Sequence, residues 1–112
     1  MAFTTSTVAR VEQGNKQLQG SFNEMWFVTL TVDPNSIAAG AEDTGTFTIP
    51  GVAVGDMVLG VSAGVSPTID ADISGYISAA NTLVIRLSNL NGAAALDLLT
   101  STWKVWIGRP GW

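Results

Sequence analysis

The feature that most constrains the fold is a series of short β-type runs separated by turn residues. The clearest is TLVIRLSN (82–89), in which Leu83, Ile85 and Leu87 fall on one face of an extended chain. The run MWFVTLTV (25–32) is rich in aromatic, β-branched and threonine residues, which favour strands. No convincing long helix competes with these runs, so the sequence predicts an all-β protein.

Four further runs add to this pattern. GTFTIPG (45–51) alternates and then closes on a proline and a glycine, MVLGVSA (57–63) follows Gly-Asp, and TWKVWIGR (102–109) is the final predicted strand. TIDADISGYIS (68–78) predicts a strand broken near Gly75. Six or more short strands with Gly, Pro and Asn turns indicate a compact antiparallel β-sandwich or jelly-roll-like domain.

Two segments fit this pattern less directly. Residues 1–24 are polar, with a possible hairpin turn at Gly14-Asn15, while a helical spacing of their apolar residues is interrupted by Gly14 and Gly20. We expect an extended N-terminal arm or hairpin over 1–24 and the β-sandwich domain over 25–112. The small apolar segment 91–99 predicts a loop or a single helical turn.

Composition excludes several classes of function. The chain has 112 residues, which is the size of one domain, and its net charge is −4 with five scattered cations. Nucleic-acid binding needs a basic patch, so we expect no nucleic-acid partner. No run approaches the roughly 18 apolar residues of a membrane span, and the first residues lack a signal-peptide pattern, so we expect no membrane partner and synthesis in the cytoplasm. Without cysteine there is no disulfide framework.

The chain is poor in catalytic groups. It contains no histidine, which removes the commonest general base and metal ligand. Asp70 and Asp72 fall on one side of an extended segment, but two acids are fewer than the six to eight oxygens that Ca²⁺ takes, and a solvated pair is favoured. Glu42 and Asp43 are interpreted as an exposed turn. We therefore expect no catalytic residue, cofactor or metal, and an acid-pair hydrolase at Asp70 and Asp72 is only a minor alternative.

The last twelve residues, STWKVWIGRPGW (101–112), hold three of the four tryptophans. Strand alternation predicts Trp103 in the core with Val105 and Ile107, and Trp106 on the opposite face. Trp106 could stack on a sugar, cover the core beneath the N-terminal arm, or anchor an interface, and Trp26 shares this ambiguity. The interface candidates are Trp26, Trp106, Arg109 and Trp112.

Three pieces of the sequence resemble a recurring pattern in virion proteins of tailed phages and cyanophages. They are GVAVGDMVLGVSAG (51–64), ISAANTLVIRLSNLNGAAA (77–95) and STWKVWIGR (101–109). In that pattern a Gly-Asp opens a strand, a Ser-Ala-Ala-Asn/Asp-Thr turn opens the next, an Asn-x-x-Gly loop follows, and a Thr-x-x-Val strand ends in Arg. The resemblance covers about residues 44–109 and omits the tail Pro110-Gly111-Trp112 and the segment before Met25.

The resemblance implies a head decoration or cement protein. Such proteins are small β-sandwich or jelly-roll subunits, often homotrimers, that bind the major capsid protein on the outer surface of the virion, and they offer no catalytic residues to carry over. A tail- or fibre-associated component is an alternative location in the virion. From a different class, a carbohydrate-binding β-sandwich module that stacks a glycan on Trp106 or Trp112 is the alternative function.

Overall fold

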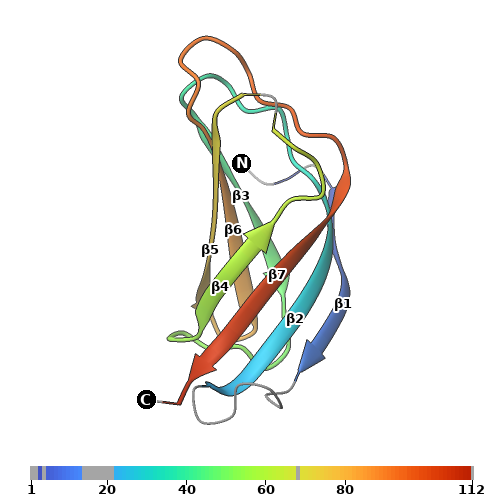
Figure 1. The fold of residues 1–112 in the computed structure, drawn as a ribbon, viewed down its shortest axis with the longest axis vertical. Helices are drawn as coiled ribbons and strands as arrows, with labels where there is room; N and C mark the ends of the chain where they lie inside the picture. Colours follow the sequence, from blue (N-terminus) through green and yellow to red (C-terminus); the bar gives the residue numbers. More distant parts are fainter. Residues whose placement is uncertain (1–2, 4, 14–21, 68, 112) are drawn as a thin grey trace.

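The computed structural model describes residues 3, 5–13, 22–67 and 69–111. These residues form a sandwich of two antiparallel sheets (Figure 1), a four-stranded sheet in the order β1-β2-β7-β4 and a three-stranded sheet in the order β3-β6-β5. The strands are β1 (Thr5–Gln13), β2 (Phe22–Asp33), β3 (Glu42–Thr48), β4 (Met57–Ser62), β5 (Ala71–Ala79), β6 (Thr82–Asn89) and β7 (Ser101–Pro110). Within the described ranges, no helix is long and apolar enough to cross a membrane. The predicted all-β sandwich is confirmed.

The strand predictions for the central part of the chain hold, with one difference. The run 82–89 is β6, and the runs at 25–32 and 102–109 lie inside β2 and β7. The predicted break at Gly75 is wrong, because β5 continues through it and pairs it with Ile85. A Cβ at Gly75 would lie 3.2 Å from side-chain atoms of both Ile85 and Val58. Glycine here permits close packing of the two sheets and does not interrupt the strand.

The core fills the space between the sheets, and its side chains follow strand alternation. Trp26 and Trp103 are fully buried on adjacent strands, and each contributes a large apolar area to the core. Their smaller buried neighbours are Val28, Leu30 and Val32 on β2, Leu83, Ile85 and Leu87 on β6, and Val105 and Ile107 on β7. The predicted separation of Trp103 from Trp106 is therefore confirmed.

The N-terminal segment contributes to this sandwich. β1 pairs antiparallel with β2 and forms an edge of the four-stranded sheet. Phe3 is buried, with its ring centroid 6.4 Å from that of Phe47 and 6.2 Å from that of Trp103. The turn predicted at Gly14-Asn15 lies outside the described residues. What we expected to be an arm or hairpin is, over residues 5–13, a strand of the sheet.

The exposed turn expected at Glu42 and Asp43 is the second prediction that the structure corrects. Glu42 and Asp43 do not form an exposed turn but begin β3, and the side chain of Asp43 is buried. Its Oδ1 accepts a hydrogen bond from the backbone N–H of Thr44 (2.9 Å), and its Oδ2 accepts one from Nδ2 of Asn35 (3.2 Å). The carboxylate thus holds the start of β3 against the β2–β3 connection, since a buried charge requires such partners.

Candidate functional site

The structure separates the predicted interface residues. Trp106 lies on the outer face of the four-stranded sheet, away from the core, with 38% of its surface exposed. Trp26 and Arg109 meet at one end of the sandwich. Trp112 lies outside the described residues. The three candidates that the structure describes therefore do not form one surface.

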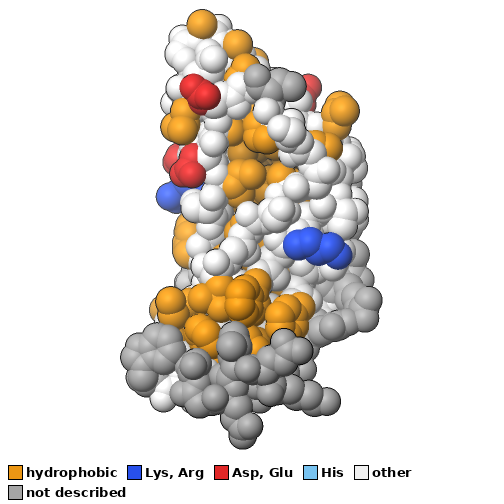
Figure 2. Space-filling view, viewed as in Figure 1, with side chains coloured by type: hydrophobic (Ala, Val, Ile, Leu, Met, Phe, Trp, Pro, Cys, Tyr) orange, Lys and Arg blue, Asp and Glu red, His pale blue; other side chains and the backbone are white. Residues whose placement is uncertain are grey.

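The outer face of the four-stranded sheet carries an aromatic pair. Phe27 on β2 lies directly beside Trp106 on β7, and their rings are stacked with centroids 6.3 Å apart and planes inclined by 17°. On the other side of Trp106 the paired residue on β4 is Gly60, which has no side chain. Figure 2 shows hydrophobic side chains gathered over the lower part of this face.

The next row across the same face is polar. Lys104 pairs with Thr29 on one side and Ser62 on the other, and its Nζ donates a hydrogen bond to Oγ1 of Thr29 (3.1 Å). The two rows together line an open groove of about 520 Å³, which we call the outer groove. Its lining residues are Phe27, Val28, Thr29, Gly60, Val61, Ser62, Lys104, Val105 and Trp106.

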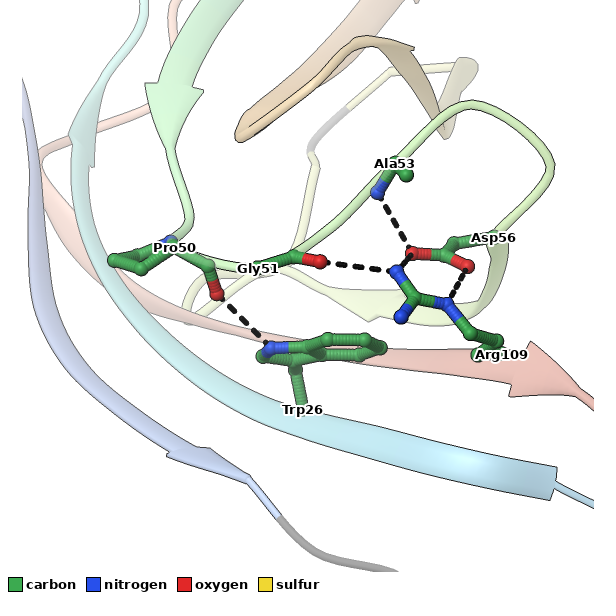
Figure 3. Close-up of polar contacts among 6 residues, drawn as sticks. All are labelled: Trp26, Pro50, Gly51, Ala53, Asp56 and Arg109. Atoms are coloured by element: carbon green, nitrogen blue, oxygen red, sulfur yellow. Dashed lines mark hydrogen bonds and ion pairs between the residues drawn. The ribbon is translucent and has the colours of Figure 1, made fainter.

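At the lower end of the sandwich in Figure 1, Arg109 forms a clamp with Asp56. The guanidinium Nε donates to Asp56 Oδ1 (2.8 Å), and Nη2 donates to Asp56 Oδ2 and to the carbonyl of Gly51 (both 2.9 Å; Figure 3). The guanidinium carbon also lies 5.2 Å from the ring centroid of Trp26. This clamp fixes the β3–β4 connection, which passes from one sheet to the other, against β2 and β7.

The electrostatics of the clamp favour the charged pair. The side chain of Asp56 is only 3% exposed, and its Oδ2 also accepts a hydrogen bond from the backbone N–H of Ala53 (2.8 Å). The hydrogen bond to Asp56 raises the pKa of Arg109 above its ordinary value, although partial burial opposes this effect. Bidentate pairing with an additional amide donor is the arrangement in which a buried carboxylate is well compensated.

Trp26 belongs to this end of the core. Its indole Nε1 donates to the carbonyl of Pro50 (3.1 Å), and its ring is fully buried beneath Arg109. An exposed position for Trp26 is therefore wrong, because the β3–β4 connection covers it. Sequence reasoning also missed the contact between Arg109 and Asp56. The two residues are 53 positions apart in the sequence, and only the strand order brings them together.

The turn between β5 and β6 binds the same connection. Asn81 has φ = 62°, a left-handed conformation that asparagine tolerates better than most residues. Its Oδ1 accepts a hydrogen bond from the N–H of Gly51 (2.9 Å), and its N–H donates to the carbonyl of Val52 (2.7 Å). The N–H of Ile49 donates in turn to the carbonyl of Asn81 (2.9 Å).

At the opposite end a buried asparagine holds two loops together. Nδ2 of Asn89 donates to the carbonyls of Ile37 (3.0 Å) and Ala94 (2.9 Å), and its Oδ1 accepts from the N–H of Asn91 (3.0 Å). Ile37 and Leu96 also exchange two backbone hydrogen bonds, of 2.7 and 2.8 Å. The predicted loop over 91–99 is thereby fixed to the β2–β3 connection.

This fixed loop presents apolar side chains outward. Leu90 is 62% exposed and Leu99 is 75% exposed. Between them, Oδ1 of Asn91 accepts hydrogen bonds from the N–H groups of Ala93 (2.8 Å) and Ala94 (2.9 Å), which closes the loop. We call residues 90–99 the apolar tip.

The predicted acidic pair is exposed. Asp70 lies just before β5 and Asp72 within it. No group of three or more His, Cys, Asp or Glu side chains that could hold a metal ion occurs in the described part of the chain.

The residues that carry the phage resemblance have structural roles. Asp56 of the Gly-Asp pair and Arg109 at the strand end form the clamp, Asn81 shapes the β5–β6 turn, and Asn89 opens the Asn-x-x-Gly loop. Comparison with known proteins found no match to the chain among protein-family models, curated proteins or solved structures.

Proposed function

We propose that this chain is a virion structural protein of the head decoration or cement type, which binds the outer capsid surface. The observation that carries the proposal is the apolar tip, an ordered loop that projects two leucines. A loop already held by Asn89 loses little conformational entropy on docking, because its backbone is fixed before contact. Such a tip is suited to packing against a partner protein.

The resemblance supports the same proposal. The Asn-x-x-Gly loop of the phage pattern corresponds to residues 89–92, which begin the apolar tip. Burial of apolar surface contributes about 25 cal/mol per Å², less the cost of association. A small contact repeated over a shell of many copies therefore gives a large total stabilisation of the capsid. The partner in this proposal is the major capsid protein.

Undecorated capsids provide the test. The purified protein is mixed with capsids assembled from the major capsid protein of its virus, and co-sedimentation is measured in low salt. We expect the wild-type chain to co-sediment and the double variant Leu90→Ser, Leu99→Ser to bind at least about tenfold more weakly. Val54→Ser is the matched control, because Val54 is 71% exposed at the other end of the sandwich. Failure of the wild-type chain to co-sediment would contradict the proposal.

Assembly as a homotrimer is part of the proposal, and its support is the resemblance. Sedimentation equilibrium at micromolar concentration should give three times the chain mass. A monomer mass would remove the trimer from the proposal and leave the capsid contact to be judged by co-sedimentation.

A further inference from the structure

We propose that the outer groove binds a pyranose ring that carries a carboxylate, as in a uronate-containing glycan. The groove lies on the outer face of the four-stranded sheet, and the apolar tip lies in the loops at one end of the sandwich. The inference therefore goes beyond the proposed virion role and does not depend on it.

Trp106 provides the stacking surface. The C–H groups on one face of a pyranose carry partial positive charge and pack on the negative face of an aromatic ring. Because Phe27 is stacked against Trp106 at 6.3 Å, the indole is held in one orientation before a ligand arrives. A preoriented ring loses little rotamer freedom on binding.

Gly60 leaves space beside the indole. A Cβ built on Gly60 would have no atom within 4 Å, so the position opposite Trp106 is open. The register shift between Val58 and Gly60 marks a β-bulge, a feature that often re-aims side chains beside functional sites. The groove volume of about 520 Å³ is within the range of small-ligand sites.

The polar row determines the kind of sugar. Lys104 uses one of its three ammonium protons on Thr29 and has the capacity to donate the others to a ligand carboxylate. Thr29 and Ser62 place hydroxyl groups on either side of it. A uronate uses both halves of the groove, with its ring on Trp106 and its carboxylate at Lys104, whereas an apolar protein surface would use the aromatic half alone.

Calorimetric titration with trigalacturonate and with maltotriose, a neutral sugar, tests the proposal. We expect saturable binding of trigalacturonate and weaker binding of maltotriose. Trp106→Ala should weaken trigalacturonate binding by about tenfold, and Lys104→Ala should reduce the preference for trigalacturonate over maltotriose by about tenfold. Gly60→Val should abolish binding by filling the open position, and it should still fold because the added Cβ has no atom within 4 Å.

The matched control is Tyr76→Ala, which removes an aromatic ring of similar exposure from the three-stranded sheet and should bind as the wild type does. Absence of saturable trigalacturonate binding would overturn the proposal. So would binding that persists in Trp106→Ala and disappears with added salt, since that is a general attraction of a polyanion to a cation. If Trp106→Ala instead abolishes self-association or capsid binding and no sugar binds, the groove is a protein interface, and the proposed function stands without the sugar.

Discussion

Asp56 and Arg109 are joined by two hydrogen bonds, of 2.8 and 2.9 Å, at a site where the carboxylate is almost inaccessible to solvent. The pair joins the segment between β3 and β4 to the end of β7. It also places the guanidinium of Arg109 over the ring of Trp26. Arg109, near the end of β7, therefore keeps this end of the sandwich closed.

Replacement of Arg109 by lysine should destabilise the protein by about 2 kcal/mol, because an ammonium cannot reproduce the two-pronged geometry and leaves Asp56 incompletely paired. Chemical denaturation measures the change. Arg86→Lys is the matched control, because Arg86 lies 3.7 Å from Glu42 in a pair whose side chains are 41% and 58% exposed, and it should change stability by less than about 0.5 kcal/mol. Equal effects in the two variants would contradict a special role for the clamp.

The raised pKa of Arg109 predicts the pH dependence of this contribution. The folded-state pKa lies above the unfolded value, so the stabilisation is fully present below the unfolded pKa and is lost only as the pH rises through the folded one. The folded-state and the unfolded-state pKa of Arg109 both lie far above neutral pH. The stability difference between the wild type and Arg109→Lys should therefore not be reduced by titration of Arg109 between about pH 7 and about pH 10. Denaturation curves at several pH values in this interval provide the measurement.

Asn81 allows its conformation and its hydrogen bond to be tested separately. Asn81→Gly keeps the left-handed backbone accessible but removes the bond to Gly51, and should cost about 1 kcal/mol. Asn81→Ala removes the same bond and adds backbone strain, and should cost about 1 kcal/mol more. Thermal or chemical denaturation distinguishes the two. If alanine is tolerated as well as glycine, the left-handed conformation is not required in the folded protein.

Asn89→Ala should be among the more damaging polar substitutions, with a loss of about 3 kcal/mol, because it removes the side-chain donor to the carbonyl of Ala94 and one of the two donors to the carbonyl of Ile37 in a buried site. Hydrogen exchange should increase at the amide of Asn91, which donates to Asn89. The control is Thr82→Ala, which removes an exposed hydrogen bond to the carbonyl of Ala80 and should not alter exchange at the tip. Unchanged protection of Asn91 in Asn89→Ala would show that the loop is held by other contacts.

Gly45 should not tolerate a side chain, because a Cβ at that position would overlap the ring of Phe3. Gly45→Ala is expected to cost about 2 kcal/mol by overpacking, whereas Gly92→Ala, which meets no neighbouring atoms, should be nearly neutral. In the background Phe3→Ala, the penalty of Gly45→Ala should largely disappear. Additive effects in this double-mutant cycle would contradict direct contact between the two positions.

Strand positions and strand faces were predictable because they depend on local alternation. The pattern of Leu83, Ile85 and Leu87 located β6, and the same reasoning placed Trp103 and Trp106 on opposite faces. The burial of Trp26 was not predictable, because alternation shows which residues share a face but not which connection covers them. For this reason the clamp could not be inferred.

The candidate site was predictable only in part. Trp106 was identified as an unsettled aromatic residue, but its neighbours Phe27 and Gly60 depend on the order β2-β7-β4, which the sequence does not reveal. The burial of Asp43 was not predictable either, because it too depends on neighbours that the sequence pattern does not reveal. An acid beside glycines is typical of a turn, and the sequence pattern does not reveal that Asn35 and the N–H of Thr44 donate hydrogen bonds to this buried one.

The hydrogen bonds of Asn89 and Asn91 that shape the apolar tip join only neutral groups. Neither protons nor salt ions compete directly for such contacts, unlike those of the ionic clamp at the other end. The backbone shape of the apolar tip should therefore change little with the salinity and acidity of the surrounding water.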